Sequence, residues 1–226
     1  MNDEIERELL DRGAEIVRFV DISGFPEKQT LGFDKAILFC MTLSKKYILD
    51  MLNNMPVDEN DEFIVKEQKV EGLADWLAGY IKQKGYYAHS QSEKNNTESG
   101  YIECAYIDPD LKQGISILPQ KSIAHIAGLG FIGKNNLLVS KKYGCAFCMC
   151  SVLTDAPVLT TNHPLISSKC DSCEACVKIC PANAIHGNEW TLDGGRESLV
   201  DVSKCCCGLK CMTICPWTLQ YARQSE

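Results

Sequence analysis

The run Cys170-Asp-Ser-Cys173-Glu-Ala-Cys176-Val-Lys-Ile-Cys180-Pro181 decides how the C-terminal part of this chain folds. Its spacing is C-x2-C-x2-C-x3-C-P. Three thiolates at this spacing can wrap a tight loop around three corners of a [4Fe-4S] cube. A zinc ribbon would instead need two C-x2-C pairs closing a four-ligand site, and the extra C-x3-C-P does not belong to that pattern. The spacing therefore predicts an iron–sulfur site.

A second cysteine group, Cys205-Cys206-Cys207-Gly-Leu-Lys-Cys211-Met-Thr-Ile-Cys215-Pro216, ends in the same C-x3-C-P. The cysteine before proline ligates the other cluster in two-cluster arrangements. We therefore expect one cluster on Cys170, Cys173, Cys176 and Cys215. The other takes Cys180, Cys211 and two of the three adjacent cysteines. We favour Cys205 and Cys207 over Cys206, because neighbouring side chains point apart while alternate ones can converge.

The cysteines are unevenly distributed, since nine of the 14 lie between Cys170 and Cys215. This shift predicts a domain over residues 1–165 and a small metal-dependent module over 166–226, which cluster ligation helps to fold. The acidic N-terminus has no secretory signal, so we expect a cytoplasmic protein. Clustered cysteines in a reducing compartment are more often metal ligands than disulfides. We expect Cys145, Cys148 and Cys150 to be small buried residues of the apolar core. The alternative is that they form an added metal site or a redox-active thiol.

Composition excludes several classes of protein. Hydrophobic residues make up 45% and charged residues 23%, which are values of a globular chain. No apolar run is long enough to span a bilayer, so no membrane partner is expected. The net charge of −7 argues against binding driven by nucleic-acid phosphates.

Hydrophobic periodicity predicts an α+β fold with helices packed on a sheet. The apolar run Lys35 to Leu43 predicts a strand buried on both faces, and Gln91 to Gly100 is expected to be a polar loop. The expected helices are residues 2–12, 44–54, 59–84 and 121–127. The other expected strands are residues 15–22, 86–89, 101–107, 136–140 and 145–153.

Glycines dominate the segment Ala127-Gly128-Leu-Gly130-Phe-Ile-Gly133-Lys134-Asn135-Asn136. It contains G-x-G-x-x-G and the start of a P-loop, but a helix precedes it, a strand follows it, and Asn135 replaces the Ser or Thr that holds magnesium. The glycines allow close backbone approach, so their amides could face a polar cofactor group beside Lys134. The alternative is a tight turn with a solvated lysine.

Residues Ala127 to Ser140, AGLGFIGKNNLLVS, followed by the cysteine run and a terminal Cys-Pro-Trp, resemble the epoxyqueuosine reductase family, which is related to the reductive dehalogenases. Lys204-Cys205 is similar to the start of the family's second cysteine set. The resemblance implies a cobalamin-binding domain of nitroreductase-like α+β fold beside a ferredoxin-like module with two [4Fe-4S] clusters that reduce the corrinoid cobalt. It also implies that Gly128, Gly130, Gly133, Lys134 and Asn135 lie in the cofactor pocket.

Two departures from the family bear on the substrate. A gap-free count places Gly114 where the full-length enzymes carry a catalytic aspartate, so the catalytic residue stays unassigned. The chain also ends at Glu226, without the helical repeats that help the full-length enzymes to hold tRNA. We therefore expect a short member of the family that does not act on tRNA.

The cysteine groups predict a protein in which two clusters deliver electrons to a redox cofactor. The resemblance alone implies that this cofactor is cobalamin and that the chain is a cobalamin-dependent reductase, with a flavin as the less favoured cofactor. An electron donor such as a ferredoxin or flavodoxin would supply the electrons, and the substrate would be a small molecule or a partner protein. The alternative is a ferredoxin-type electron-transfer protein that reduces a partner and has no substrate of its own.

Overall fold

The chain divides into two compact units, each built from three separate segments. The computed structural model describes residues 1–54, 61–98, 118–191, 194–206 and 208–224. Unit 1 comprises Met1–Met41, Phe63–Ala127 and Cys148–His163, and unit 2 comprises Thr42–Glu62, Gly128–Phe147 and Pro164–Glu226. The last segment of unit 2 thus begins close to the boundary expected at residue 165. The glycine loop, which we expected in the first domain, lies in unit 2. The assignment of cofactor binding to one domain and of cluster binding to the other stays a prediction.

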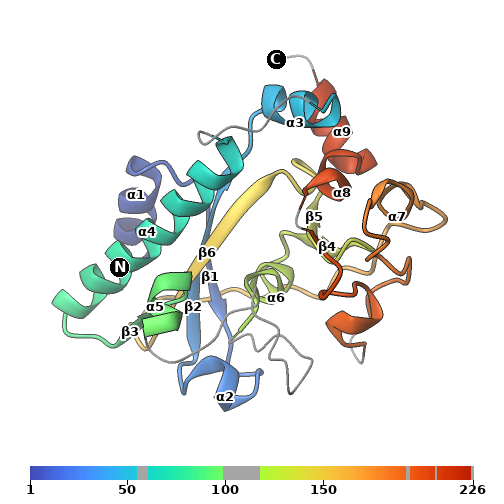
Figure 1. Cartoon of the computed structure of the whole chain (residues 1–226). Helices are drawn as coiled ribbons and strands as arrows, with labels where there is room; N and C mark the ends of the chain where they lie inside the picture. Colours follow the sequence, from blue (N-terminus) through green and yellow to red (C-terminus); the bar gives the residue numbers. More distant parts are fainter. Residues whose placement is uncertain (55–60, 99–117, 192–193, 207, 225–226) are drawn as a thin grey trace. The chain divides into compact units, whose positions relative to one another are not determined.

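A four-stranded sheet of order β1-β2-β6-β3 forms the centre of unit 1 (Figure 1). β1 (Ile16–Asp21) pairs antiparallel with β2 (Lys35–Thr42), and β3 (Ala88–Ser90) pairs antiparallel with β6 (Phe147–Thr154). Every residue of β2 after Lys35 is buried, which confirms the strand expected from its continuous apolar run. The α+β class is therefore confirmed.

Helices α1 (Asn2–Asp11) and α4 (Glu62–Gln83) lie side by side in unit 1. Tyr80 of α4 and Lys84, directly after the helix, both donate hydrogen bonds to Glu4 of α1. The buried side chains of α4 recur at helical spacing, as its sequence predicts, and they are Val70, Leu73, Ala74, Leu77, Ala78 and Ile81. The remaining helices of this unit are α2 (Glu27–Thr30), α5 (Glu93–Glu98) and α6 (Gln120–Ile126).

Helix α5 corrects the loop that we expected over residues 91–100. Ser92 explains the difference, because its hydroxyl accepts a hydrogen bond from the backbone N–H of Asn95 at 3.1 Å. Such a bond satisfies a donor at the start of a helix and lets a polar segment become helical. The strand expected over 101–107 lies outside the described residues, as does Gly114.

Unit 2 combines one short hairpin with short helices. β4 (Gly130–Ile132) pairs antiparallel with β5 (Leu138–Ser140), so the glycine loop contains a strand that the sequence did not predict. Helix α3 (Lys45–Leu52) packs against α8 (Lys210–Thr213) and α9 (Pro216–Arg223), and α7 (Ala175–Ile179) packs against α8. A 3-10 turn spans Arg196–Ser198. No helix in the described ranges combines the length and hydropathy that crossing a bilayer requires.

Candidate metal centre

Four cysteines from the two cysteine groups line one cavity of about 140 Å³ in unit 2. They are Cys170, Cys173, Cys176 and Cys215, the same set that the crossed ligand arrangement predicts. Two come from the loop before α7, the third lies in α7, and the fourth lies at the start of α9. Among the described residues, no three metal-binding side chains converge as they would around a single ion. Thiols around a cavity suit a multi-atom cluster better than one zinc ion.

A tight turn shapes the loop that carries the first three cysteines. The backbone N–H of Cys173 donates to the carbonyl oxygen of Cys170 at 2.8 Å, and Asp171 takes a left-handed conformation with φ 43°. Aspartate tolerates this conformation better than most residues. Helix α7 then carries Cys176 and ends at Cys180, whose ψ of 111° leaves the helical region. The turn and the short helix together direct three thiols to one side.

Cys215 occupies the N-cap position of α9, directly before Pro216. The hydrogen bond from the Cys145 thiol holds the pKa of Cys215 below its usual range, and backbone N–H groups of Thr218 and Trp217 act in the same direction. The pKa of Cys145 is correspondingly raised, first by this bond and then by burial. N–H groups at a helix start favour a thiolate, which is the form of Cys215 that a metal would bind.

The cysteines of the second expected cluster lie near one another where they are described. Burial raises the pKa of Cys211 to about 12, and neighbouring thiols, among them Cys205 and Cys180, contribute to the shift. Cys205 and Cys206 are exposed, whereas Cys207 lies outside the described residues. Cys180 and Cys211 pack against the same apolar cluster, and the assignment of Cys180, Cys205, Cys207 and Cys211 to a second metal cluster stays a prediction.

Apolar side chains pack around Cys176, Cys180 and Cys211 and limit the access of water to them. Cys176 belongs to a buried cluster with Ile132, Ala184, Ile185, Leu199 and Val200, and Cys180 and Cys211 pack against this cluster. Trp217 lines the cavity and meets Phe131 edge to face, with ring centroids 5.7 Å apart. A low-polarity shell of this kind is one of the features that set the potential of an iron–sulfur cluster.

The glycine loop packs directly on the cysteine cavity. A Cβ at Gly130 would lie 2.1 Å from the carbonyl oxygen of Val139, so only glycine allows the β4–β5 pairing at this point. A Cβ at Gly133 would lie 2.8 Å from Oδ1 of Asn135 and 3.7 Å from Sγ of Cys170. Gly128 begins the segment, directly after α6 and Ala127. The closely spaced glycines therefore bring the loop backbone against β5 and the first cysteine.

Lys134 and Asn135 are each only 7% exposed and contact the cysteine segments. Nζ of Lys134 donates to the carbonyl oxygens of Asp171 at 2.6 Å and Cys173 at 3.2 Å. Nδ2 of Asn135 donates to the carbonyl oxygen of Cys211 at 3.2 Å and contacts the sulfur of Cys145 at 3.7 Å. The side-chain N–H donors of Lys134 and Asn135 are thus engaged within unit 2. The expected role of this loop in corrinoid binding stays a prediction.

Cys145 is a residue whose contact with the second cysteine group the sequence did not show. It is buried, as expected for an apolar role, but its thiol donates to Cys215 and its backbone N–H donates to Oγ1 of Thr218 at 3.0 Å. No sequence spacing links Cys145 to the second cysteine group, so only the fold reveals the contact. Cys148 and Cys150 are buried in β6 of unit 1.

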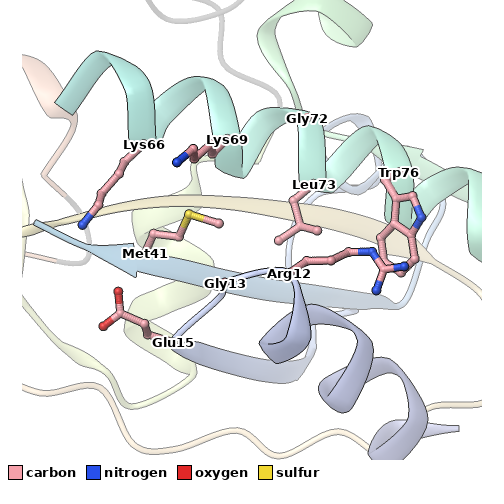
Figure 2. Close-up of a pocket in the computed structure, with 9 residues that line it drawn as sticks. All are labelled: Arg12, Gly13, Glu15, Met41, Lys66, Lys69, Gly72, Leu73 and Trp76. Carbon is pink, nitrogen blue, oxygen red and sulfur yellow. The ribbon is translucent and has the colours of Figure 1, made fainter. Parts of the chain in front are cut away.

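A larger cavity, of about 600 Å³, lies in unit 1 between α1, β2 and α4 (Figure 2). Its wall includes the guanidinium of Arg12, which stacks 3.9 Å from the ring centroid of Trp76 and pairs with Glu8 of its own helix. Lys66 and Lys69 of α4 and Glu15 also line it. None of the residues that we expected to bind metal or cofactor lies in this cavity.

Residues 163–186 match the 4Fe-4S binding domain family. The chain is also similar to curated epoxyqueuosine reductases. It is 40% identical over 77 residues to that of Pseudomonas aeruginosa, covering 34% of this chain and 21% of the relative. It is 35% identical over 77 residues to that of Escherichia coli, covering 34% of this chain and 20% of the relative. The matched region thus spans about a fifth of the length of these relatives.

Solved structures of low sequence identity share the fold over nearly the whole chain. An epoxyqueuosine reductase from Streptococcus thermophilus aligns with a TM-score of 0.58 at 15% identity, covering 96% of this chain and 66% of that one. A reductive dehalogenase described as acting by B12-dependent dehalogenation aligns with a TM-score of 0.59 at 18% identity, covering 93% of this chain and 32% of that one.

Another epoxyqueuosine reductase, solved with an epoxyqueuosine-modified tRNA stem loop, aligns with a TM-score of 0.57 at 15% identity, covering 96% of this chain and 65% of that one. The resemblance seen in the motifs is confirmed: the sequence is similar to epoxyqueuosine reductases over about a third of the chain. Over nearly all of its length the chain shares its fold with solved epoxyqueuosine reductases and reductive dehalogenases.

Proposed function

We propose that this chain is an iron–sulfur oxidoreductase in which two [4Fe-4S] clusters deliver electrons to a corrinoid for the reduction of a substrate. The meeting of Cys170, Cys173, Cys176 and Cys215 on one cavity is the observation that carries the proposal. The matching 4Fe-4S binding domain supports the cluster type. The likeness to a B12-dependent dehalogenase supports the corrinoid, which would supply the reducing metal centre when bound.

The chain's own residues would bind and tune the clusters. Cys170, Cys173, Cys176 and Cys215 hold the first, and Cys180, Cys205, Cys207 and Cys211 hold the second. A helix N-terminus stabilises the Cys215 thiolate, while the side chains of Ile132, Ile185 and Trp217 exclude water. Two adjacent clusters suit one-electron steps from a donor of the ferredoxin or flavodoxin class. A purely structural role would not require a second cluster.

The test is an elemental and spectroscopic count on anaerobically prepared protein. We expect about eight iron and about eight sulfide per chain, the content of two cubes, and an EPR signal after reduction with dithionite. Added cobalamin should bind and shift its visible spectrum. Stoichiometric zinc in place of iron, or a single cube, contradicts the cluster proposal.

An electron-transfer protein without a substrate is the second candidate. The contacts of Lys134 and Asn135 favour it, because these donors are engaged by the cysteine segments. It predicts two clusters and no cobalamin binding under anaerobic conditions. Titration with an epoxyqueuosine-modified tRNA stem loop supplies a separate arm, in which tight binding would overturn our expectation that tRNA is not a substrate.

A further inference from the structure

The buried ammonium of Lys134 lies on the loop between β4 and β5 and faces the first cysteine loop. Its two acceptors, the carbonyl oxygens of Asp171 and Cys173, both belong to the segment between Cys170 and Cys176. The side chain therefore spans from the glycine loop to the backbone that sets the positions of three ligands. A flexible ligand loop gains a defined shape from such contacts.

The neighbouring residues make the same connection. Gly133 allows the loop to approach Sγ of Cys170, since a Cβ there would lie only 3.7 Å from that sulfur. Asn135 donates to the carbonyl oxygen of Cys211, in the second cysteine group. Residues 133–135 thus contact both cysteine groups, and Lys134 is the charged member of the three.

Where the structure describes its surroundings, the ammonium of Lys134 is bonded to backbone carbonyl oxygens and forms no ion pair with a carboxylate. Burying an ammonium is costly unless opposite charge or strong hydrogen bonds compensate it. The two carbonyl dipoles supply part of this compensation. Four thiolates around the same cavity give a [4Fe-4S] cluster a net negative charge, which increases on reduction. A buried cation in the wall of this cavity would stabilise the reduced cluster more than the oxidised one.

Lys169 provides the comparison within the same cavity. It also lines the cavity, but its side chain is exposed to solvent. Water and salt screen an exposed charge far more than a buried one. Lys134 and Lys169 carry the same charge, but the buried Lys134 would shift the reduction potential of a cluster in this cavity more strongly than the exposed Lys169.

We propose that Lys134 is a positioning residue of the first cluster, which ties its ligand loop in place and raises its reduction potential through a buried positive charge. This inference rests on the proposed function. Lys134→Gln removes the charge but keeps an N–H donor, Lys134→Arg keeps both, and Lys169→Gln removes the exposed charge of the same cavity.

The experiment is an EPR-monitored redox titration of the anaerobic full-length protein with dithionite, together with an iron count. In Lys134→Gln we expect one of the two midpoint potentials to move to lower values, while Lys134→Arg and Lys169→Gln stay close to wild type. Loss of about half the iron in Lys134→Gln, restored in Lys134→Arg, also supports the inference through the positioning role.

Two results overturn the inference alone. One is a Lys134→Gln protein that holds both clusters at unchanged potentials. The other is a Lys169→Gln protein in which the same midpoint moves as far as it does in Lys134→Gln. A wild-type chain that takes up no cluster overturns the proposed function, and this inference with it, so the two failures are distinguishable.

Discussion

Gly144 lies against Thr218, so close that a Cβ at Gly144 would stand 2.3 Å from the backbone nitrogen of Thr218 and 2.5 Å from its hydroxyl oxygen. The next residue, Cys145, donates its backbone N–H to that hydroxyl at 3.0 Å. Thr218 belongs to the first turn of α9, directly after the N-cap residue Cys215. The contact therefore holds the helix start that carries the fourth thiol of the cavity.

Gly144→Ala is expected to destabilise the protein and lower its cluster content. The added methyl group meets backbone that cannot move aside, and the φ of +59° is unfavourable for alanine. Together these effects cost about 1–3 kcal/mol of unfolding free energy. A lower denaturant midpoint and a reduced iron count would show this.

Gly79→Ala is the matched control for Gly144→Ala. Gly79 lies within α4, and nothing within 4 Å meets an added Cβ. Alanine should stabilise the helix by about 0.5–1 kcal/mol and leave the iron count unchanged. A Gly144→Ala protein as stable as wild type would contradict the role of the Gly144–Thr218 contact.

Single Cys→Ser substitutions should distinguish ligands from non-ligands in the second cysteine group. Cys205→Ser is expected to lose about half of the iron, which is one of two cubes, whereas Cys206→Ser keeps all of it. Cys205 is among the thiols that influence Cys211, which favours it as a ligand. Iron and sulfide counts on anaerobic protein decide the matter, and loss of iron in Cys206→Ser alone would reverse the assignment.

Cys145 is expected to tune the first cluster without binding it. Its thiol donates to Cys215, and hydrogen bonds to ligand sulfur raise the potential of an iron–sulfur cluster. Cys145→Ala should therefore keep its full iron content and show one midpoint potential at lower values. Cys148→Ala, which removes a thiol that donates to the carbonyl oxygen of Phe63, is the control with unchanged potentials. Iron loss in Cys145→Ala would make Cys145 a ligand.

Cluster assembly should be more complete at higher pH. Burial raises the pKa of Cys176 to about 11 and that of Cys211 to about 12, from an ordinary value of 9.0. Iron binds thiolates, so each ligand must first lose its proton. Iron uptake by the apo chain is therefore expected to rise from about pH 6 to about pH 9, measured by absorbance during reconstitution.

The same shifts determine how the stability of the apo chain depends on pH. The folded chain keeps these thiol protons to about pH 11 or 12, while the unfolded chain loses them near pH 9.0. The folded state thus binds more protons in this interval, and the unfolding free energy of the apo chain falls as the pH rises through it. A flat profile above pH 9 would contradict the burial of Cys176 and Cys211.

Local patterns made part of this molecule predictable. The spacing from Cys170 to Cys176 identifies a ligand loop because the required turn involves adjacent residues only. The apolar run of β2 likewise reports burial on both faces within a single strand. Helix α5 was missed because its polar residues are typical of a loop, and the hydroxyl of Ser92 decides the outcome.

Long-range packing made the rest unpredictable. Nζ of Lys45 donates to the carbonyl oxygen of Gln224, and the hydroxyl of Tyr221 donates to that of Leu43. These contacts join residues 179 and 178 positions apart, and no periodicity reports such a pairing. The sequence therefore did not show that 42–62 and the glycine loop belong with the cysteine segments, or that Lys134 contacts the ligand backbone.

The three-segment construction of unit 2 imposes an order on biosynthesis. Its first segment begins at Thr42, but the thiol set of its cavity is complete only with Cys215. Domains generally fold as units as the chain leaves the ribosome. Residues 42–62 thus emerge from the ribosome long before α8 and α9, the helices that α3 packs against. Until then, the face of α3 that packs on these helices stays uncovered. The four-thiol set is therefore completed late in synthesis, and a nascent chain stalled before Cys215 would expose the other thiols to oxidation.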